Sequence, residues 1–279
     1  MVAYLDTCTI LNLLQINYDD EYIKHLVKSF EEIKLTPIVF QELGSNKFVN
    51  VIDDSHKEVL NNVIFNQIQK YVDYSNSDDT LAFTKKHNSE CFKDNGESHS
   101  VSYSVKLSRF GKNDFGDNLL KTHFISDDAP AQKDFNHFYQ INVVGQILNS
   151  IDLMTIFWLK QYITKNDLIK YCHSLKQLYN KDIGLLLIKL KDYSRDFVDD
   201  LSSKQKIVFT KLIEILSNIQ DDTNNKISEI ISDPDFKDVL KKNKDWKELL
   251  TNIQQSNFRE KIPYINKRMQ DLEKVWEVI

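Results

Sequence analysis

The stretch Met1-Val2-Ala3-Tyr4-Leu5-Asp6-Thr7-Cys8-Thr9-Ile10-Leu11 decides how the 279-residue chain begins to fold. Residues 2–5 form an apolar run that predicts a short strand, and residues 8–16 have the spacing of a short helix. Asp6 therefore stands where the first strand should stop. A carboxylate at that position can bind a metal ion, but it can equally cap the helix that follows.

Acidic residues at three further positions lie beside apolar runs or glycine turns. Glu42 follows the second apolar run, Glu97 follows Gly96, and the pair Asp127-Asp128 ends a third run. Each has a plain structural explanation, because acids in the first turn of a helix complement its dipole and short polar residues cap helices. Together with Asp6 they are harder to explain in this way, and they suggest one active site.

The first part of the chain alternates short apolar runs with amphipathic stretches, as α/β folds do. Pro37 is expected near the end of its apolar run, where it prepares the start of a helix. Further strands are expected over residues 123–125 and 141–144, and helices over residues 20–33, 55–72, 97–108 and 130–138. Strands that are separated by helices and end in acids predict a parallel sheet with its site at the carboxyl edge.

The final third of the chain has a different composition. All six glycines lie at or before Gly184, and the sequence beyond it places Leu and Ile at helical spacing among Lys, Asp and Asn. We therefore expect a first domain over residues 1–185 and an all-helical C-terminal region over residues 186–279, with Pro263 breaking or kinking what precedes the last helix. Two apolar stripes carry this expectation: Val208, Leu212, Ile215 and Ile219, and Ile265, Met269, Leu272, Trp276 and Ile279.

Composition limits the class of protein. With 41% apolar and 28% charged residues, the chain is expected to be soluble and globular, and no apolar stretch approaches the roughly 20 residues that span a bilayer. No membrane partner is therefore expected, and the lack of a basic and apolar leader predicts a cytoplasmic location. Cys8, Cys91 and Cys172 are widely separated, so neither a disulfide framework nor a cysteine zinc site is indicated.

The net charge of −5 argues against a protein that coats nucleic acid through bulk electrostatics. It does not exclude a nuclease, because divalent cations bound by carboxylates supply local positive charge. Mg²⁺ and Mn²⁺ prefer oxygen ligands and keep several waters, so a few acids converging from different elements are enough to bind them. The seven histidines form no pattern typical of a zinc site.

Five segments resemble, in order and approximate spacing, the motifs of PIN domains. Tyr4-Leu5-Asp6-Thr7-Cys8-Thr9-Ile10-Leu11 resembles their opening strand, and Leu35-Thr36-Pro37-Ile38-Val39-Phe40-Gln41-Glu42-Leu43 resembles their second element, in which a Glu follows a strand and a proline-containing turn. Asn95-Gly96-Glu97-Ser98-His99-Ser100-Val101 is similar to the Gly-Glu helix start of one PIN subgroup. Phe124-Ile125-Ser126-Asp127-Asp128 resembles the adjacent aspartates of that subgroup, and Val143-Val144-Gly145 resembles its strand-glycine turn. The resemblance extends over the expected first domain.

The resemblance implies a central parallel sheet flanked by helices, with a metal-dependent nuclease site at one edge. The catalytic acids it implies are Asp6, Glu42, Glu97 and Asp128, of which Asp6, Glu97 and Asp128 bind Mg²⁺ or Mn²⁺. Thr7 and Ser126 match hydroxyl residues that support the acids, and Asp127 helps or replaces Asp128. The implied activity is that of an endonuclease, most naturally a ribonuclease, and small nucleases of this family often act as toxins paired with antitoxins or in antiviral defence.

The chain departs from compact PIN domains at two places. Residues 43–95 are longer than such domains need, and Lys106 to Asn118 inserts a polar stretch before the strand that leads to Asp127. Both segments could shape substrate access. His99 and His123 lie near the expected site by sequence, and a structural role is favoured for each.

Other functions stay open at this stage. One is a PIN-like module that binds nucleic acid or a protein without cutting it. RNA is the expected partner and DNA is not excluded, while the C-terminal helices could bind a protein inhibitor or a second copy of the chain. A basic cluster near Trp246 could contact RNA through phosphates, although interleaved acids favour a solvated helix face: Lys237, Lys241, Lys242, Lys244 and Lys247.

Overall fold

The computed structural model describes residues 1–16, 21–45, 61–110, 122–196, 201–218, 223–234, 237 and 258–274. It divides into two compact units, Met1–Tyr171 and Cys172–Ile279. The division lies within helix α10 (Lys165–Asp196), earlier in the chain than the boundary that the glycine distribution indicates. Each unit is described by itself.

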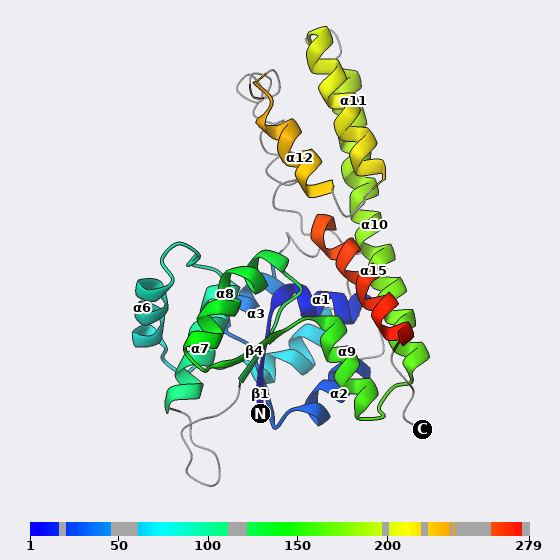
Figure 1. Ribbon diagram of the computed structural model, residues 1–279. Helices are drawn as coiled ribbons and strands as arrows, with labels where there is room; N and C mark the ends of the chain where they lie inside the picture. The colour runs from blue at the N-terminus through cyan, green and yellow to red at the C-terminus, as the bar shows by residue number, and fades with distance from the viewer. Residues whose placement is uncertain are drawn as a thin grey trace. The chain divides into compact units, whose positions relative to one another are not determined.

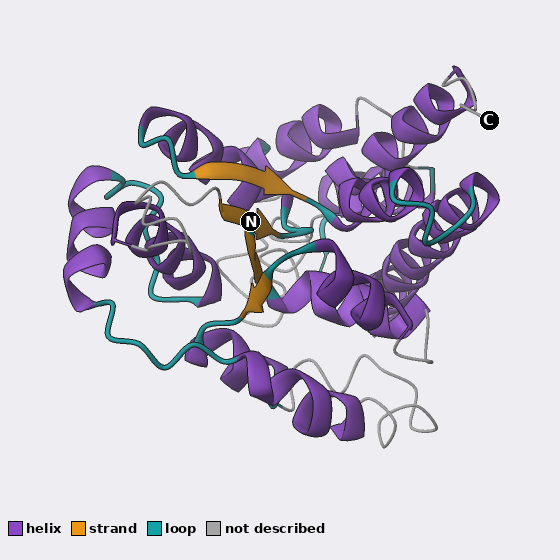
Figure 2. Ribbon diagram, turned by 90° about the horizontal axis from the view of Figure 1, so that it is seen from below, coloured by secondary structure: helices purple, strands orange, loops and turns teal. Residues whose placement is uncertain are grey.

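The first unit is built around an all-parallel sheet of four strands, which Figures 1 and 2 show among helices. The strands are β1 (Val2–Leu5), β2 (Glu32–Lys34), β3 (Thr122–Ile125) and β4 (Gly145–Leu148), in the spatial order β2-β1-β3-β4. The expected α/β fold with a central parallel sheet is confirmed. Because the chain order reverses at β1, the carboxyl ends of β1 and β3 form the switch point at which open α/β sheets bind ligands.

Helices and short helical turns join these strands. They are α1 (Thr7–Ile16), α2 (Glu21–Ser29), α3 (Pro37–Leu43), a π-helical turn (Ile64–Ile68), a 3₁₀ turn (Gln69–Tyr71), α6 (Asp78–His87), α7 (Gly96–Phe110), α8 (Ala129–Ile141) and α9 (Ser150–Leu159). Helix α6 has no counterpart in the expected pattern. Residues 32 and 33, which were expected to end a helix, belong to β2 instead.

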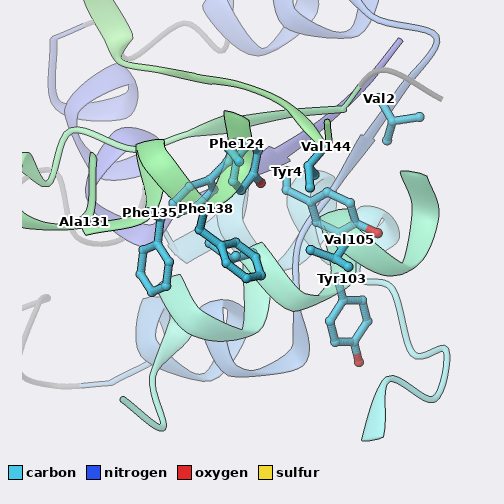
Figure 3. Close-up of a cluster of buried hydrophobic side chains, with 11 residues drawn as sticks. Val2, Tyr4, Tyr103, Val105, Phe124, Ala131, Phe135, Phe138 and Val144 are labelled. Atoms are coloured by element: carbon cyan, nitrogen blue, oxygen red, sulfur yellow. The ribbon is translucent and has the colours of Figure 1, made fainter. Parts of the chain in front are cut away.

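One face of the sheet packs against α7 and α8. Tyr4 and Phe124, from β1 and β3, are buried among aromatic and β-branched side chains of these two helices, as Figure 3 shows. The helix residues of this cluster are Val101, Tyr103, Val105, Ala131, Phe135, Phe138 and Tyr139. Because strand side chains alternate between faces, Ala3 and His123 point to the other face, which α1, α2 and α9 cover (Figure 1).

The strand expected over residues 141–144 is wrong. Helix α8 runs to Ile141. The residues after it are hydrogen-bonded to its last turn and not to a strand, since the Val144 N–H donates to the Tyr139 carbonyl over 3.1 Å. The strand begins at Gly145, where a Cβ would lie 1.7 Å from the Thr122 carbonyl oxygen. Gly145 is therefore the start of β4 and not the turn after it, because only glycine lets the two backbones approach so closely.

Helix α3 begins as expected from its proline. Pro37 occupies the first helical position, and the Thr36 hydroxyl accepts a hydrogen bond from the Val39 N–H over 3.3 Å. Glu42 consequently lies in the last turn of α3. A role for Glu42 in complementing the N-terminal end of the helix dipole is therefore excluded.

The second unit is helical in its described part, which confirms the expected helical C-terminal region. Its elements besides α10 are α11 (Ser203–Ser217), α12 (Thr223–Ser232) and α15 (Phe258–Lys274), and Pro263 lies inside α15. Of the two apolar stripes, Val208, Leu212, Ile265 and Leu272 are buried, and Ile215 and Met269 are half-buried. Ile219, Lys241, Lys242, Lys244, Trp246, Lys247, Trp276 and Ile279 lie outside the described residues.

None of the helices in the described ranges combines the length and the apolar character needed to cross a membrane.

Candidate functional site

The candidate site begins where β1 and β3 end side by side. The Asp6 N–H donates to the Ile125 carbonyl over 2.9 Å, and the Ser126 N–H donates to the Leu148 carbonyl over 2.9 Å. These bonds extend the ladder by one residue and set Asp6 next to Ser126. Two residues expected at the site from the sequence thus meet at the switch point of the sheet.

Asp6 is buried, and its carboxyl group accepts hydrogen bonds from the side chains of Ser126 and Cys8 and from the Thr7 N–H. Its Oδ2 accepts from the Ser126 hydroxyl over 2.7 Å and from the Cys8 thiol over 2.8 Å, and its Oδ1 accepts from the Thr7 N–H over 2.8 Å. Burial raises the pKa of Asp6 to about 6, and the charges of Asp128 and Glu42 act in the same direction, while the bonds from Cys8 and Ser126 oppose it.

Glu42 reaches the site from α3 and is held by two donors. The Thr7 hydroxyl donates to Oε2 over 2.6 Å, and the Gly96 N–H donates to Oε1 over 3.0 Å. A Cβ at position 96 would lie 2.7 Å from Glu42 Oε2 and 2.9 Å from Val39 Cγ2. Gly96 is thus required for the start of α7 to approach Glu42, which explains the glycine before Glu97.

Glu97 and Asp128 form a carboxyl pair. Burial raises the pKa of Glu97 far above its ordinary value, and a side-chain hydrogen bond with Asp128 and the charges of Asp128 and Asp6 raise it further. A hydrogen bond between two carboxyl groups requires a proton on one of them. Asp128 precedes α8 without capping it through its side chain, and its buried Oδ1 has no hydrogen-bond partner among the described residues.

Asp127 has a different environment from its neighbour. Its Oδ2 accepts from the Asn12 amide over 2.6 Å, and its Oδ1 accepts from the Ser150 N–H over 2.9 Å. Both oxygens of this buried carboxylate are engaged in joining the end of β3 to α1 and to the start of α9. This arrangement gives Asp127 a structural role and leaves Asp128 as the aspartate that meets Glu97.

Cys8 and Asn95 are two contact residues that the sequence did not single out. Cys8 bonds Asp6, and Asn95 donates to Glu97 Oε2 over 3.3 Å while its own amide oxygen accepts from the Ser98 N–H over 3.2 Å. An asparagine three residues before Ser98, directly ahead of a Gly-Glu helix start, is a sequence signal for such a cap.

The two histidines noted near the site have contacts with residues outside it. His99 bonds Asp94 over 2.8 Å. His123 lies 3.3 Å from the Met1 sulfur and packs against Phe30, on the face of the sheet away from α7 and α8. Both contacts agree with the structural roles that were favoured.

The donor set suits a hard divalent cation, although the side chains do not form a ready coordination shell. Across the described ranges, no group of three or more His, Cys, Asp and Glu side chains is arranged to hold a metal ion. The acids supply only oxygen donors, and in the part of the chain that the structure places, none of the four forms an ion pair with Lys or Arg. A cation would therefore have to replace the hydrogen bond between Glu97 and Asp128.

Comparison with protein-family models, with curated proteins and with solved structures found no match to this chain. The resemblance to PIN domains therefore rests on the sequence segments quoted above.

Proposed function

We propose that this chain is a divalent-metal-dependent nuclease of the PIN-like type, which hydrolyses phosphodiester bonds and most naturally acts on RNA. The observation that carries the proposal is the convergence of Asp6, Glu42, Glu97 and Asp128 at the switch point of the sheet, with no Lys or Arg ion pair to them within the described residues. Of these, Asp6 and Glu97 are buried carboxyl groups with raised pKa values, and such groups cluster at functional sites.

In this proposal Asp6, Glu97 and Asp128 hold Mg²⁺ or Mn²⁺. Once bound, the cation supplies Lewis-acid chemistry, which activates water and stabilises charge that develops on the phosphate. Glu42 is fixed by Thr7 and Gly96, so its carboxylate can orient a water or a ligand with little loss of conformational entropy. The expected products carry a 5′-phosphate and a 3′-hydroxyl.

The decisive experiment incubates the purified protein with single-stranded RNA and with single-stranded DNA, with and without Mn²⁺. We expect cleavage of RNA only with the cation, and none above background in Asp6→Asn, because that substitution removes a ligand charge while preserving the side-chain shape. Glu90→Gln, an exposed acid outside the site, is the matched control and should cleave like the wild type. Full activity of Asp6→Asn would refute the assignment.

A second candidate function is a non-catalytic module that binds nucleic acid or a protein. The observation that favours it is the closed Glu97–Asp128 pair, together with the lack of a ready metal shell in the described residues. Titration calorimetry with Mn²⁺ separates the two functions. Heat of binding that disappears in Asp6→Asn supports the nuclease, and no heat in the wild type supports the binding module.

Two finer parts of the proposal rest on the family resemblance alone: a role as a toxin or in antiviral defence, and a protein inhibitor as partner. A cytoplasmic location and a second copy bound through the C-terminal helices are proposed from the composition and the apolar stripes of the sequence.

A further inference from the structure

Two donors converge on one oxygen of Asp6. The Ser126 hydroxyl and the Cys8 thiol both donate to Oδ2, over 2.7 Å and 2.8 Å, and the two donor atoms lie 3.7 Å apart. A carboxylate oxygen has about two lone-pair directions. Oδ2 therefore accepts two hydrogen bonds, whereas the bond shown for Oδ1 within the described residues comes from the Thr7 N–H, over 2.8 Å.

We propose that Cys8 is a positioning residue of the candidate metal site, which acts with Ser126 to fill Oδ2 of Asp6 and so presents Oδ1 to the divalent cation. This inference rests on the proposed function and adds to it a residue that the family motifs do not assign. Groups that hydrogen-bond a metal-ligating carboxylate fix its orientation, and their loss typically weakens metal binding by about 10-fold to 100-fold.

The surroundings of Cys8 argue for this role over simple space filling. Cys8 lies in the first turn of α1 and is half-buried, whereas its neighbours Thr7 and Thr9 are buried. Cys8 and Ser126 both donate to one oxygen of a buried side chain, so the loss of either donor would leave the Asp6 carboxyl group freer to turn.

The test measures the Kd for Mn²⁺ by titration calorimetry in the full-length protein with matched substitutions. Cys8→Ser and Cys8→Thr keep a donor, while Cys8→Ala and Cys8→Val lack one at similar size. We expect the Ser and Thr variants to bind Mn²⁺ within about 3-fold of the wild type and the Ala and Val variants to bind about 10-fold more weakly. A purely structural role would instead order the variants by side-chain volume.

A double-mutant cycle with Ser126→Ala tests whether the two donors serve the same oxygen. Either donor alone still holds Oδ2 in part, so the double variant Cys8→Ala with Ser126→Ala should lose more Mn²⁺ affinity than the two single losses predict together. Additive losses would overturn the shared role. The melting temperature of each variant without metal shows whether it is folded, and Cys8→Val replaces Cys8→Ala if the latter does not unfold cooperatively.

The outcomes separate this inference from the proposed function. If Cys8→Ala and Cys8→Val bind Mn²⁺ as tightly as the wild type while Asp6→Asn does not bind, the metal site stands and the role of Cys8 is refuted. If the wild type itself binds no Mn²⁺, the metal site is refuted, and the role of Cys8 falls with it.

Discussion

Asp6 and Glu97 are carboxyl groups whose ionised forms the fold opposes. Burial raises the pKa of both, and each lies near the charge of Asp128. Positions of this kind store unfavourable energy that a bound cation can release, so substitutions that remove function are expected to stabilise the metal-free protein. Asp127 joins the end of β3 to α1 and to the start of α9 through its two oxygens, so its substitution should destabilise the protein.

The first residue-scale prediction concerns Glu97→Gln. The amide cannot ionise and can still donate to Asp128, so the melting temperature measured in EDTA should rise by a few degrees, which corresponds to about 1 kcal/mol. Addition of Mn²⁺ should raise the melting temperature of the wild type and leave that of Glu97→Gln unchanged. Glu90→Gln should match the wild type in both conditions; a lower melting temperature for Glu97→Gln in EDTA would count against a strained site.

The second residue-scale prediction concerns pH. The pKa of Asp6 is raised on folding from 3.8 to about 6, so its stabilising contribution is complete below pH 3.8 and is lost as pH rises through about 6. The difference in melting temperature between Asp6→Asn and the wild type in EDTA should therefore grow from about pH 4 to about pH 7. Comparing the variants cancels His25, whose lowered pKa gives a contribution that is lost as pH falls.

At the scale of elements, the approach of α7 to α3 decides the shape of the site. The N-terminal end of α7 donates its Gly96 N–H to Glu42, and the same helix carries Glu97 toward Asp128. Hydrophobic packing of α7 on β1 and β3 supplies the support, through Val101, Tyr103 and Val105 (Figure 3). A small change at the start of this helix should therefore affect two of the four acids.

The element-scale prediction compares two glycines in helices. Alanine ordinarily stabilises a helix relative to glycine by about 1 kcal/mol. Gly184→Ala in α10 should show this gain, because the described residues beyond the helix's own backbone place no atom within 4 Å of the added Cβ. Gly96→Ala should instead destabilise the protein and weaken Mn²⁺ binding, since its Cβ would lie 2.7 Å from Glu42 Oε2. Chemical denaturation of both variants measures the two effects, and equal stabilisation would contradict the proposed close contact.

At the scale of the whole molecule, the chain forms two compact units, and the four acids belong to Met1–Tyr171. Units with separate cores can unfold in separate steps, and a ligand stabilises only the unit that binds it. Differential scanning calorimetry should therefore resolve two transitions. Mn²⁺ should shift one of them and Gly184→Ala the other, whereas a single transition that responds to both would show that the units unfold together.

Local sequence patterns determine many of the strands and helices of this protein without reference to tertiary contacts. The strand that ends at Asp6, the helix that starts at Pro37, the order of the acids and the helical final third were all predicted, because alternation, capping and proline geometry act between residues close in the chain. The start of β4 at Gly145 was not, since it depends on the approach of Thr122 from another strand.

Only the tertiary structure decided how the acids are used. Glu42 is held by the backbone of Gly96, 54 residues away, and Asp127 and Asp128 differ in role because Asn12 and Ser150 engage one while Glu97 meets the other. Cys8 entered the site because the sheet sets Ser126 beside Asp6. Such contacts join residues far apart in sequence, and the free energy of each depends on burial and neighbouring charges that no local pattern contains.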